Sequence, residues 1–242
     1  MDSTNGFCTK NCSNISELEH KYQFFISKFS HEARNQLTLI NSSLQLIAKE
    51  HPDLSGSALW SQTLEDVHDT ISLLQDTSAY TKNTELNSRL IHPDELLHKV
   101  AGSFYSNMEE KEILFSDVFH PNLANAFIFA DELKLKEAIT NLLLNAMDAV
   151  SETSAAQKRI SFTSETDSHF LIIHVKDNGC GIPASHLDTI FDPFVTYKAH
   201  GTGLGLAIVK KIVEQHQGLL SVDTCSEPPH TYTDFCLKIP LC

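Results

Sequence analysis

Positive charge is scarce in this sequence of 242 residues, in which 18 Lys and Arg stand against 31 Asp and Glu. The formal net charge of −13 argues against a nucleic-acid or anionic-membrane partner, because such binding depends mainly on Lys and Arg. No apolar run approaches the ~20 residues that span a bilayer, and the N-terminus lacks a basic segment followed by an apolar stretch. These absences predict a cytoplasmic protein without membrane insertion, in which any anionic ligand is held by a local arrangement.

Cysteine is also sparse, with six in the chain. This number is too small for a disulfide scaffold, so we interpret the cysteines as free thiols. Cys8 and Cys12 are four residues apart but lack a second pair or an adjacent histidine, which makes a metal site there a weak interpretation. With 41% hydrophobic and 20% charged residues, the chain has the composition of a protein that buries a core.

Two apolar stripes at steps of three and four residues occupy the first third of the chain, which is the period of an amphipathic helix. The first stripe comprises Ile15, Leu18, Tyr22, Phe25, Phe29, Ala33, Leu37, Ile40, Leu44 and Ile47, and the second comprises Leu64, Val67, Ile71, Leu74 and Ser78. Pro52 and Gly56 separate them, which predicts a helical hairpin. Because one hairpin cannot bury both apolar faces, we expect a homodimeric four-helix bundle.

The rest of the chain mixes helical and strand patterns, which predicts a two-layer α/β domain of about 150 residues. Helices are expected at about 93–106, 131–150 and 204–216, and strands at 113–119, 126–130, 159–163, 169–175, 219–224 and 233–239. The two strands at 159–175 have the spacing of a hairpin. A polar stretch at about 76–89 is the expected boundary between the two domains.

A polar cluster interrupts the first apolar stripe at His31, Glu32, Arg34 and Asn35. At about 100° per residue, His31 lies away from the apolar side of the helix. A neutral exposed imidazole can act as a nucleophile, and the adjacent Glu32 can accept the ring proton or orient the ring. Asn35, one turn later, shares the His31 face and could position a water or a phosphoryl oxygen. The alternative is a solvated polar face with an incidental histidine.

Two asparagines, Asn141 and Asn145, lie four residues apart in an otherwise apolar helix and therefore share a face. An amide oxygen is a hard ligand that suits Mg²⁺, which is usually completed by waters and substrate phosphates. Polar residues that hydrogen-bond a neighbouring loop are the alternative.

The segment VKDNGCGIP follows a strand and places Asp177, Gly179 and Gly181 in a turn. The glycines permit a close backbone approach to a flat ligand. An ionised carboxylate only accepts hydrogen bonds, so Asp177 can bind the amino group of adenine and disfavours the carbonyl of guanine.

A glycine run, Gly201, Gly203 and Gly205, leads into a helix whose N-terminal amides can bind phosphate without a basic protein. Lys198 could add a point charge at the terminal phosphate. The run does not directly follow a strand and lacks the G-x-G-x-x-G spacing, which argues against a dinucleotide-binding fold. It also lacks GK[ST], which argues against a Walker A loop.

In this order, the segments HEARN, NLLLNA, DNGCGIP, DPF and GTGLGL closely resemble sensor histidine kinases of two-component systems. The resemblance covers about residues 20–241. It implies an α+β protein with a short N-terminal segment (1–14), a dimerisation and histidine phosphotransfer hairpin (15–88) and a Bergerat-type, two-layer ATP-binding domain (89–242). ATP and Mg²⁺ are the implied ligands, and the receiver domain of a response regulator is the implied partner.

The resemblance assigns roles position by position. His31 would be the phospho-acceptor, Glu32 its acid/base partner, and Asn35 the residue linked to dephosphorylation of the regulator. Asn141 and Asn145 would lie at the Mg-nucleotide, with Asn145 as the metal ligand, and Asp177 would bind adenine. The remaining nucleotide-binding positions are Gly179, Gly181, Phe194, Lys198, Thr202, Gly203, Leu204, Gly205 and Thr233.

Two features depart from the family. Gln36 stands where the family commonly has proline, which predicts a straighter first helix. Few residues precede the hairpin, so we expect the signal to arrive through a partner, the N-terminal segment or the ATP-binding domain.

The expected reaction is ATP-dependent autophosphorylation of His31 followed by transfer to an aspartate of a response regulator. One alternative is a regulator-directed phosphatase or phosphotransfer scaffold whose ATP site acts as a ligand switch. Another is an ATP-driven clamp or serine kinase of the same nucleotide fold, against which the HEARN segment counts. The residues do not specify the stimulus or whether phosphorylation occurs within or between subunits.

Overall fold

The computed structural model describes residues 5–81, 85–121, 123, 126–151, 153, 157–198 and 201–242, with side chains of the first helix described from Phe24 onward. Contacts divide the chain into two compact units. The first unit comprises Met1–Thr84 and Thr196–Leu204, and the second comprises Glu85–Val195 and Gly205–Cys242. Within the described ranges, no helix is long and apolar enough to cross a membrane. The metal-site interpretation of Cys8 and Cys12 concerns side chains outside the described ones.

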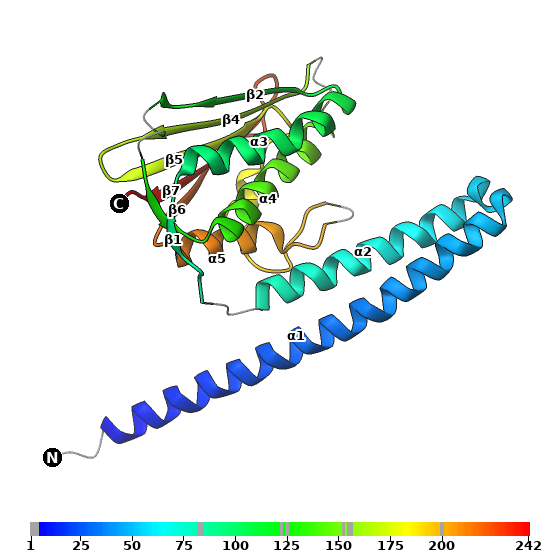
Figure 1. The fold of residues 1–242 in the computed structure, drawn as a ribbon, viewed down its shortest axis with the longest axis horizontal. Helices are drawn as coiled ribbons and strands as arrows, with labels where there is room; N and C mark the ends of the chain where they lie inside the picture. The colour runs from blue at the N-terminus through cyan, green and yellow to red at the C-terminus, as the bar shows by residue number, and fades with distance from the viewer. Residues whose placement is uncertain are drawn as a thin grey trace. The chain divides into compact units, whose positions relative to one another are not determined.

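The first unit contains the helical hairpin, formed by α1 (Asn5–Glu50), the short 3-10 helix η1 (Pro52–Gly56) and α2 (Ala58–Thr81) (Figure 1). Pro52 occupies the first turn of η1, where its missing N–H is not needed. Ser57 precedes α2 and accepts a hydrogen bond from the Trp60 N–H at 3.4 Å. The expected hairpin is present, although α1 begins ten residues before Ile15, because helical structure extends beyond the apolar stripe on which the prediction was based.

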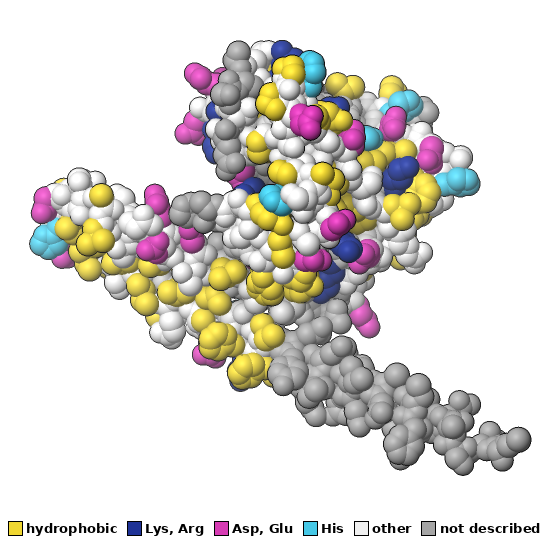
Figure 2. Space-filling model, turned by 180° about the vertical axis from the view of Figure 1, so that it is seen from behind, with side chains coloured by type: hydrophobic (Ala, Val, Ile, Leu, Met, Phe, Trp, Pro, Cys, Tyr) yellow, Lys and Arg dark blue, Asp and Glu magenta, His cyan; other side chains and the backbone are white. Residues whose placement is uncertain are grey.

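The hairpin has almost no buried interior of its own. Among its described side chains only Ser30 and Ser78 are buried. Large apolar groups of the predicted stripe remain exposed, including Phe25 at 67% and Phe29 at 60%. Apolar side chains are visible along the described part of the hairpin in Figure 2. One hairpin therefore leaves a substantial apolar surface without cover.

The second unit is built on a five-stranded sheet with the order β2-β4-β5-β7-β6. The strands are β2 (Leu114–Phe119), β4 (Arg159–Thr166), β5 (Phe170–Asp177), β7 (Tyr232–Pro240) and β6 (Leu219–Cys225). β2 runs parallel to β4, and the other neighbours are antiparallel. The expected hairpin is confirmed as β4–β5, with a tighter turn than predicted because Asp167 accepts hydrogen bonds from the backbone N–H groups of His169 and Phe170.

Three helices, α3 (Pro93–Glu110), α4 (Glu132–Ser151) and α5 (Gly205–Gln215), cover one face of this sheet (Figure 1). The core lies between the two layers, where apolar residues of α4 such as Leu142 meet alternate residues of the strands such as Phe162 and Leu237. Apolar residues recur with a period of 3.6 in the helices and of 2 in the strands, and both sets therefore face the same core. The fold is α+β, as expected from the sequence.

A second, two-stranded sheet pairs β1 (Arg89–Ile91) with β3 (Ile128–Ala130) and was missed as a pair. The prediction placed Arg89 at the end of the polar boundary stretch, whereas it starts β1. Three residues are too few to show a periodic pattern, so this strand is stabilised by its partner rather than by local preference. A short 3-10 helix, η3 (Ala184–His186), lies after β5.

A buried histidine fixes the start of α4 against the end of α5. His216 is 7% exposed, and its Nε2 accepts a hydrogen bond from the Asp131 N–H at 3.0 Å. The distance of 2.7 Å between its Nδ1 and the Ile212 carbonyl oxygen makes Nδ1 the donating nitrogen. Asp131 in turn caps α4 by accepting from the Leu133 and Lys134 N–H groups. These hydrogen bonds thus fix the relative position of α4 and α5, the two helices that carry candidate site residues.

Candidate functional site

The most deeply buried of the ionisable candidate residues is Asp177, the last residue of β5, which is 4% exposed. Its Oδ1 accepts a hydrogen bond from the Gly179 N–H at 2.8 Å. Directly across the β5–β7 ladder lies Thr233, which is 3% exposed and on the same helix-covered face. A carboxylate is costly to bury, so its retention beside a hydroxyl at the end of a strand marks a candidate binding site.

The loop after Asp177 is wedged between the end of β6 and the end of α4. Gly181 has a φ of +72°, and a Cβ there would lie 2.1 Å from the Cys225 carbonyl oxygen. A Cβ on Gly179 would lie 2.6 Å from the carbonyl carbon of Ala149. Both glycines are therefore required by the packing of the loop itself, which is a structural reason beyond the ligand approach expected from the sequence.

Thr224 of β6 ties this loop to Thr233 and was missed by sequence reasoning. Its Oγ1 accepts from the Ile182 N–H at 2.9 Å, donates to the Tyr232 carbonyl oxygen at 2.7 Å and lies 3.4 Å from Thr233 Oγ1. No local pattern could have indicated this role, because it arises from the pairing of β6 with β7.

The two asparagines lie on the side of α4 that meets the start of α5. Both are half-buried, and Asn141 Oδ1 would lie 3.8 Å from a Cβ on Gly205, the first residue of α5. One turn earlier, Glu137 accepts an ion-paired hydrogen bond from Lys134 Nζ at 2.7 Å. Sequence reasoning missed Glu137, although its spacing of four from Asn141 repeats that of Asn145. The result is a row of oxygen-bearing side chains along one face of α4.

Phe194 ends the second unit's DPF segment and adopts an unusual backbone conformation. Its φ is +66° and its side chain is 59% exposed. A bulky residue in the left-handed region is an outlier in folded proteins and often marks a functional turn. The structure does not bring Phe194 into a described contact with Asp177 or the asparagines.

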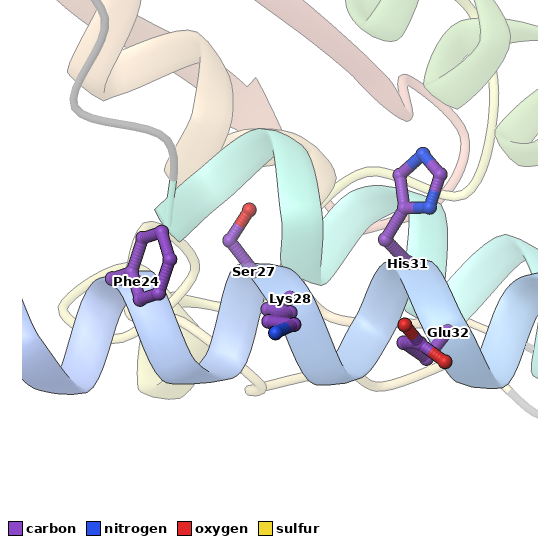
Figure 3. A pocket seen from close by; sticks show the side chains of 5 residues that line it. All are labelled: Phe24, Ser27, Lys28, His31 and Glu32. Carbon is purple, nitrogen blue, oxygen red and sulfur yellow. The ribbon is translucent and has the colours of Figure 1, made fainter.

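The polar cluster of α1 lies in the first unit. His31 is exposed, and the Nδ2 atom of Asn35 lies 3.5 Å from its Nδ1. A shallow hollow of about 250 Å³ beside it is lined by Phe24, Ser27, Lys28, His31 and Glu32. Figure 3 shows Ser27 and His31 projecting from the same side of α1. An exposed imidazole beside an open hollow can be reached by a large reactant.

The candidate phosphate loop also belongs largely to the first unit. Gly203 has a φ of +69°, which explains its identity. Leu204 is fully buried, and its N–H donates to Thr202 Oγ1 at 3.4 Å. The Thr202 hydroxyl in turn donates to Asp76 Oδ2 of α2 at 2.7 Å. Lys198 is half-buried, with its N–H directed to Thr196 Oγ1 at 3.2 Å. Asp76 was not predicted as a site residue.

Comparison with known proteins places these features in a family. Residues 130–242 match the family described as histidine kinase-, DNA gyrase B-, and HSP90-like ATPase. The chain is 31% identical over 212 residues to the sensor histidine kinase ZraS of Escherichia coli, covering 84% of this chain and 43% of ZraS. It is 29% identical over 204 residues to the histidine-protein kinase AtoS of the same organism, covering 84% of this chain and 33% of AtoS. The chain therefore spans less than half the length of either relative.

Solved structures agree with these sequence relatives. The catalytic domain of histidine kinase ThkA matches with a TM-score of 0.55 at 27% identity, covering 64% of this chain and 97% of that chain. Full-length ShkA in complex with AMPPNP matches in fold with a TM-score of 0.70 at 23% identity, covering 89% of this chain and 45% of that chain. The chain belongs with the sensor histidine kinases, and its C-terminal half is an ATPase domain of the histidine kinase, gyrase B and HSP90 type.

Proposed function

We propose that this chain is an ATP-dependent protein-histidine kinase that phosphorylates its own His31 and passes the phosphoryl group to an aspartate of a response regulator. The observation that carries the proposal is the exposed His31 on a helical hairpin joined to an ATPase domain of this family. The domain boundaries we propose are 1–14, 15–88 and 89–242. The first compact unit also includes Thr196–Leu204. Because this segment lies far along the chain, a division of the sequence into consecutive domains cannot assign it to the first unit.

Adenine binding is proposed at Asp177 and Thr233. The buried carboxylate accepts a hydrogen bond from the adenine amino group, and the neighbouring hydroxyl can donate to or accept from the ring. Gly179 and Gly181 hold the adjoining loop in place. ShkA, which shares the fold, was solved with the ATP analogue AMPPNP, and this supports a nucleotide site in the same domain.

Phosphate binding is proposed for the segment around the start of α5. Gly203, Leu204 and Gly205 lead into the helix, whose first N–H groups attract anions, and Lys198 adds positive charge. Thr202 and Phe194 complete this group. These local groups could therefore bind the negatively charged phosphates of ATP even though the molecule as a whole is acidic.

The α4 asparagines fit a magnesium ion by their chemistry. Their amide oxygens are hard donors, and both side chains are only half-buried, so solvent and phosphate oxygens can complete the ligand set. Asn145 is the proposed metal ligand, with Asn141 beside it. A bound Mg²⁺ would neutralise charge that develops on the transferring phosphoryl group.

Phosphoryl transfer requires His31 to act as a nucleophile. The lone pair of one ring nitrogen forms a bond to the γ-phosphorus while the bond from that phosphorus to the bridging oxygen of ADP breaks. The ring then loses the proton on its other nitrogen, for which Glu32 is the adjacent acceptor. We assign the attack to Nε2 and the proton to Nδ1. Because the Asn35 NH2 group, 3.5 Å from Nδ1, can only donate, this assignment requires the Asn35 amide to turn its oxygen toward Nδ1. Positioning and charge stabilisation supply most of the catalysis.

A homodimer is proposed because the hairpin cannot cover its own apolar surface. Its described part buries no large apolar side chain, while Phe24, Phe25, Phe29, Leu39 and Leu46 are each more than half exposed. Packing a second hairpin against this surface would form a four-helix bundle.

Incubation of the full chain with γ-labelled ATP and Mg²⁺ tests the proposal. We expect label that is lost in acid and retained in alkali, as for a phosphoimidazole. The His31→Ala variant should not be labelled, whereas His68→Ala, which removes another exposed histidine of the hairpin, should be labelled normally. Acid-stable label, or label that persists in His31→Ala, would overturn the proposal.

A further inference from the structure

We propose that Asp76 of α2 is an internal competitor of the ATP phosphates: its carboxylate holds the phosphate-loop residue Thr202 and must be released before the nucleotide binds tightly. This inference rests on the proposed function, since it assigns a regulatory contact to the same nucleotide site. It names a residue that no family motif in the sequence indicated.

The contact is a short hydrogen bond between residues that are far apart in the chain. Thr202 Oγ1 donates to Asp76 Oδ2 at 2.7 Å, and 126 positions separate the two residues. Both side chains are half-buried, which limits competition from water. A hydrogen bond to an ionised acceptor is about twice as strong as a neutral one.

The carboxylate provides what a phosphate would provide to the loop. It carries a negative charge and acceptor oxygens, and it uses the single proton that the Thr202 hydroxyl can donate. The Leu204 N–H is also engaged within the loop, because it donates to Thr202 Oγ1 at 3.4 Å. A polyphosphate that approaches this segment therefore meets a like charge and donors that are already occupied.

The position of Asp76 on α2 explains why the contact is inhibitory rather than productive. The Leu74 carbonyl oxygen accepts a hydrogen bond from Arg34 Nη2 of α1 at 3.2 Å, which marks the side of α2 that faces α1. Asp76 is two residues from Leu74 and lies about 200° around the helix from it. It holds Thr202 on the side of α2 that faces away from α1, the helix that carries His31.

Binding of AMPPNP with Mg²⁺ to the full-length chain, measured by isothermal titration calorimetry, tests the inference without any phosphoryl transfer. If the loop must first be released from Asp76, the apparent Kd equals the intrinsic Kd divided by the fraction of chains in which the loop is released. Asp76→Ala should lower the Kd by about tenfold, the usual effect of one charge-assisted hydrogen bond on an equilibrium constant. Asp76→Asn keeps an acceptor but removes the charge, and should lower the Kd by roughly threefold because the neutral bond is weaker.

Asp66→Ala is the matched control, because it removes an exposed carboxylate from the same helix, one that accepts a hydrogen bond from the nearby Gln62 Nε2. Its Kd should equal that of the unmodified chain. If the unmodified chain binds the nucleotide and Asp76→Ala binds it equally or more weakly, Asp76 does not compete, while the proposed function stands. If neither chain binds the nucleotide, the proposed function is overturned and the competition with it. Unchanged helical circular dichroism establishes that each variant is folded.

Discussion

Replacement of Gly181 by alanine should destabilise the ATPase domain, whereas the same replacement at Gly102 should stabilise it. At Gly181 the φ of +72° costs an alanine about 1–2 kcal/mol. The new Cβ would also lie 2.1 Å from a backbone oxygen of Cys225, which forces the loop to shift at a further cost of about 1–3 kcal/mol. Gly102 lies within α3 with nothing within 4 Å of a new Cβ, and alanine there should gain about 1 kcal/mol in helix propensity.

Thermal unfolding followed by calorimetry measures both changes in the full chain. With a loss of about 3 kcal/mol and a shift of roughly 2–4 °C per kcal/mol for a domain of this size, Gly181→Ala should lower the Tm of the ATPase domain by about 6–12 °C. Gly102→Ala should raise it by about 2–4 °C by the same conversion. A Gly181→Ala chain that melts at the unmodified temperature would refute the description of this loop as tightly wedged against β6.

Three further predictions concern other parts of the second unit. Asp177→Asn adds donor capacity where adenine donates, so the Kd for ATP should rise at least tenfold while the Tm changes little, as measured by calorimetry; an unchanged Kd would contradict the adenine assignment. His216→Ala leaves the Asp131 N–H without its acceptor and should lower the free energy of unfolding by about 1–3 kcal/mol; equal urea midpoints would contradict this role. Burial raises the pKa of the Cys236 thiol, so at pH 8 an alkylating reagent should modify Cys236 more slowly than the exposed Cys180. The rate at Cys236 should increase as the pH rises. Mass spectrometry of timed samples measures both rates, and equal rates at pH 8 would contradict the burial.

Features that depend on local pattern were predicted well from the sequence. The apolar spacing in α4 places Leu135, Ile139, Leu142, Leu143 and Ala146 on its inner side, and all five are buried. The short spacing between the two strand segments at 159–175 likewise predicted a hairpin, which is present as β4–β5. Periodicity determines these elements because each buries one continuous face against the core.

Features that depend on distant pairing could not be predicted from local pattern. β1 exists because Leu90 pairs with Phe129, 39 positions later. Thr224 becomes an organiser of the binding loop only when β6 lies beside β7. The Thr202 partner Asp76 lies in a polar stretch that read as a boundary. In each case the chemistry of the single residue is ordinary, and the fold supplies the partner.

The uninterrupted course of α1 has a mechanical consequence. Gln36 retains the backbone N–H that proline lacks, and the helix continues through it from Asn5 to Glu50. At a rise of 1.5 Å per residue, His31 lies about 39 Å along the helix axis from Asn5. Because α1 is continuous over this length, a rotation of its N-terminal end about the helix axis would also rotate the His31 side chain about that axis. Under the proposed function, the angle at which His31 faces ATP would therefore depend on rotation of α1 as well as on contacts at the histidine itself.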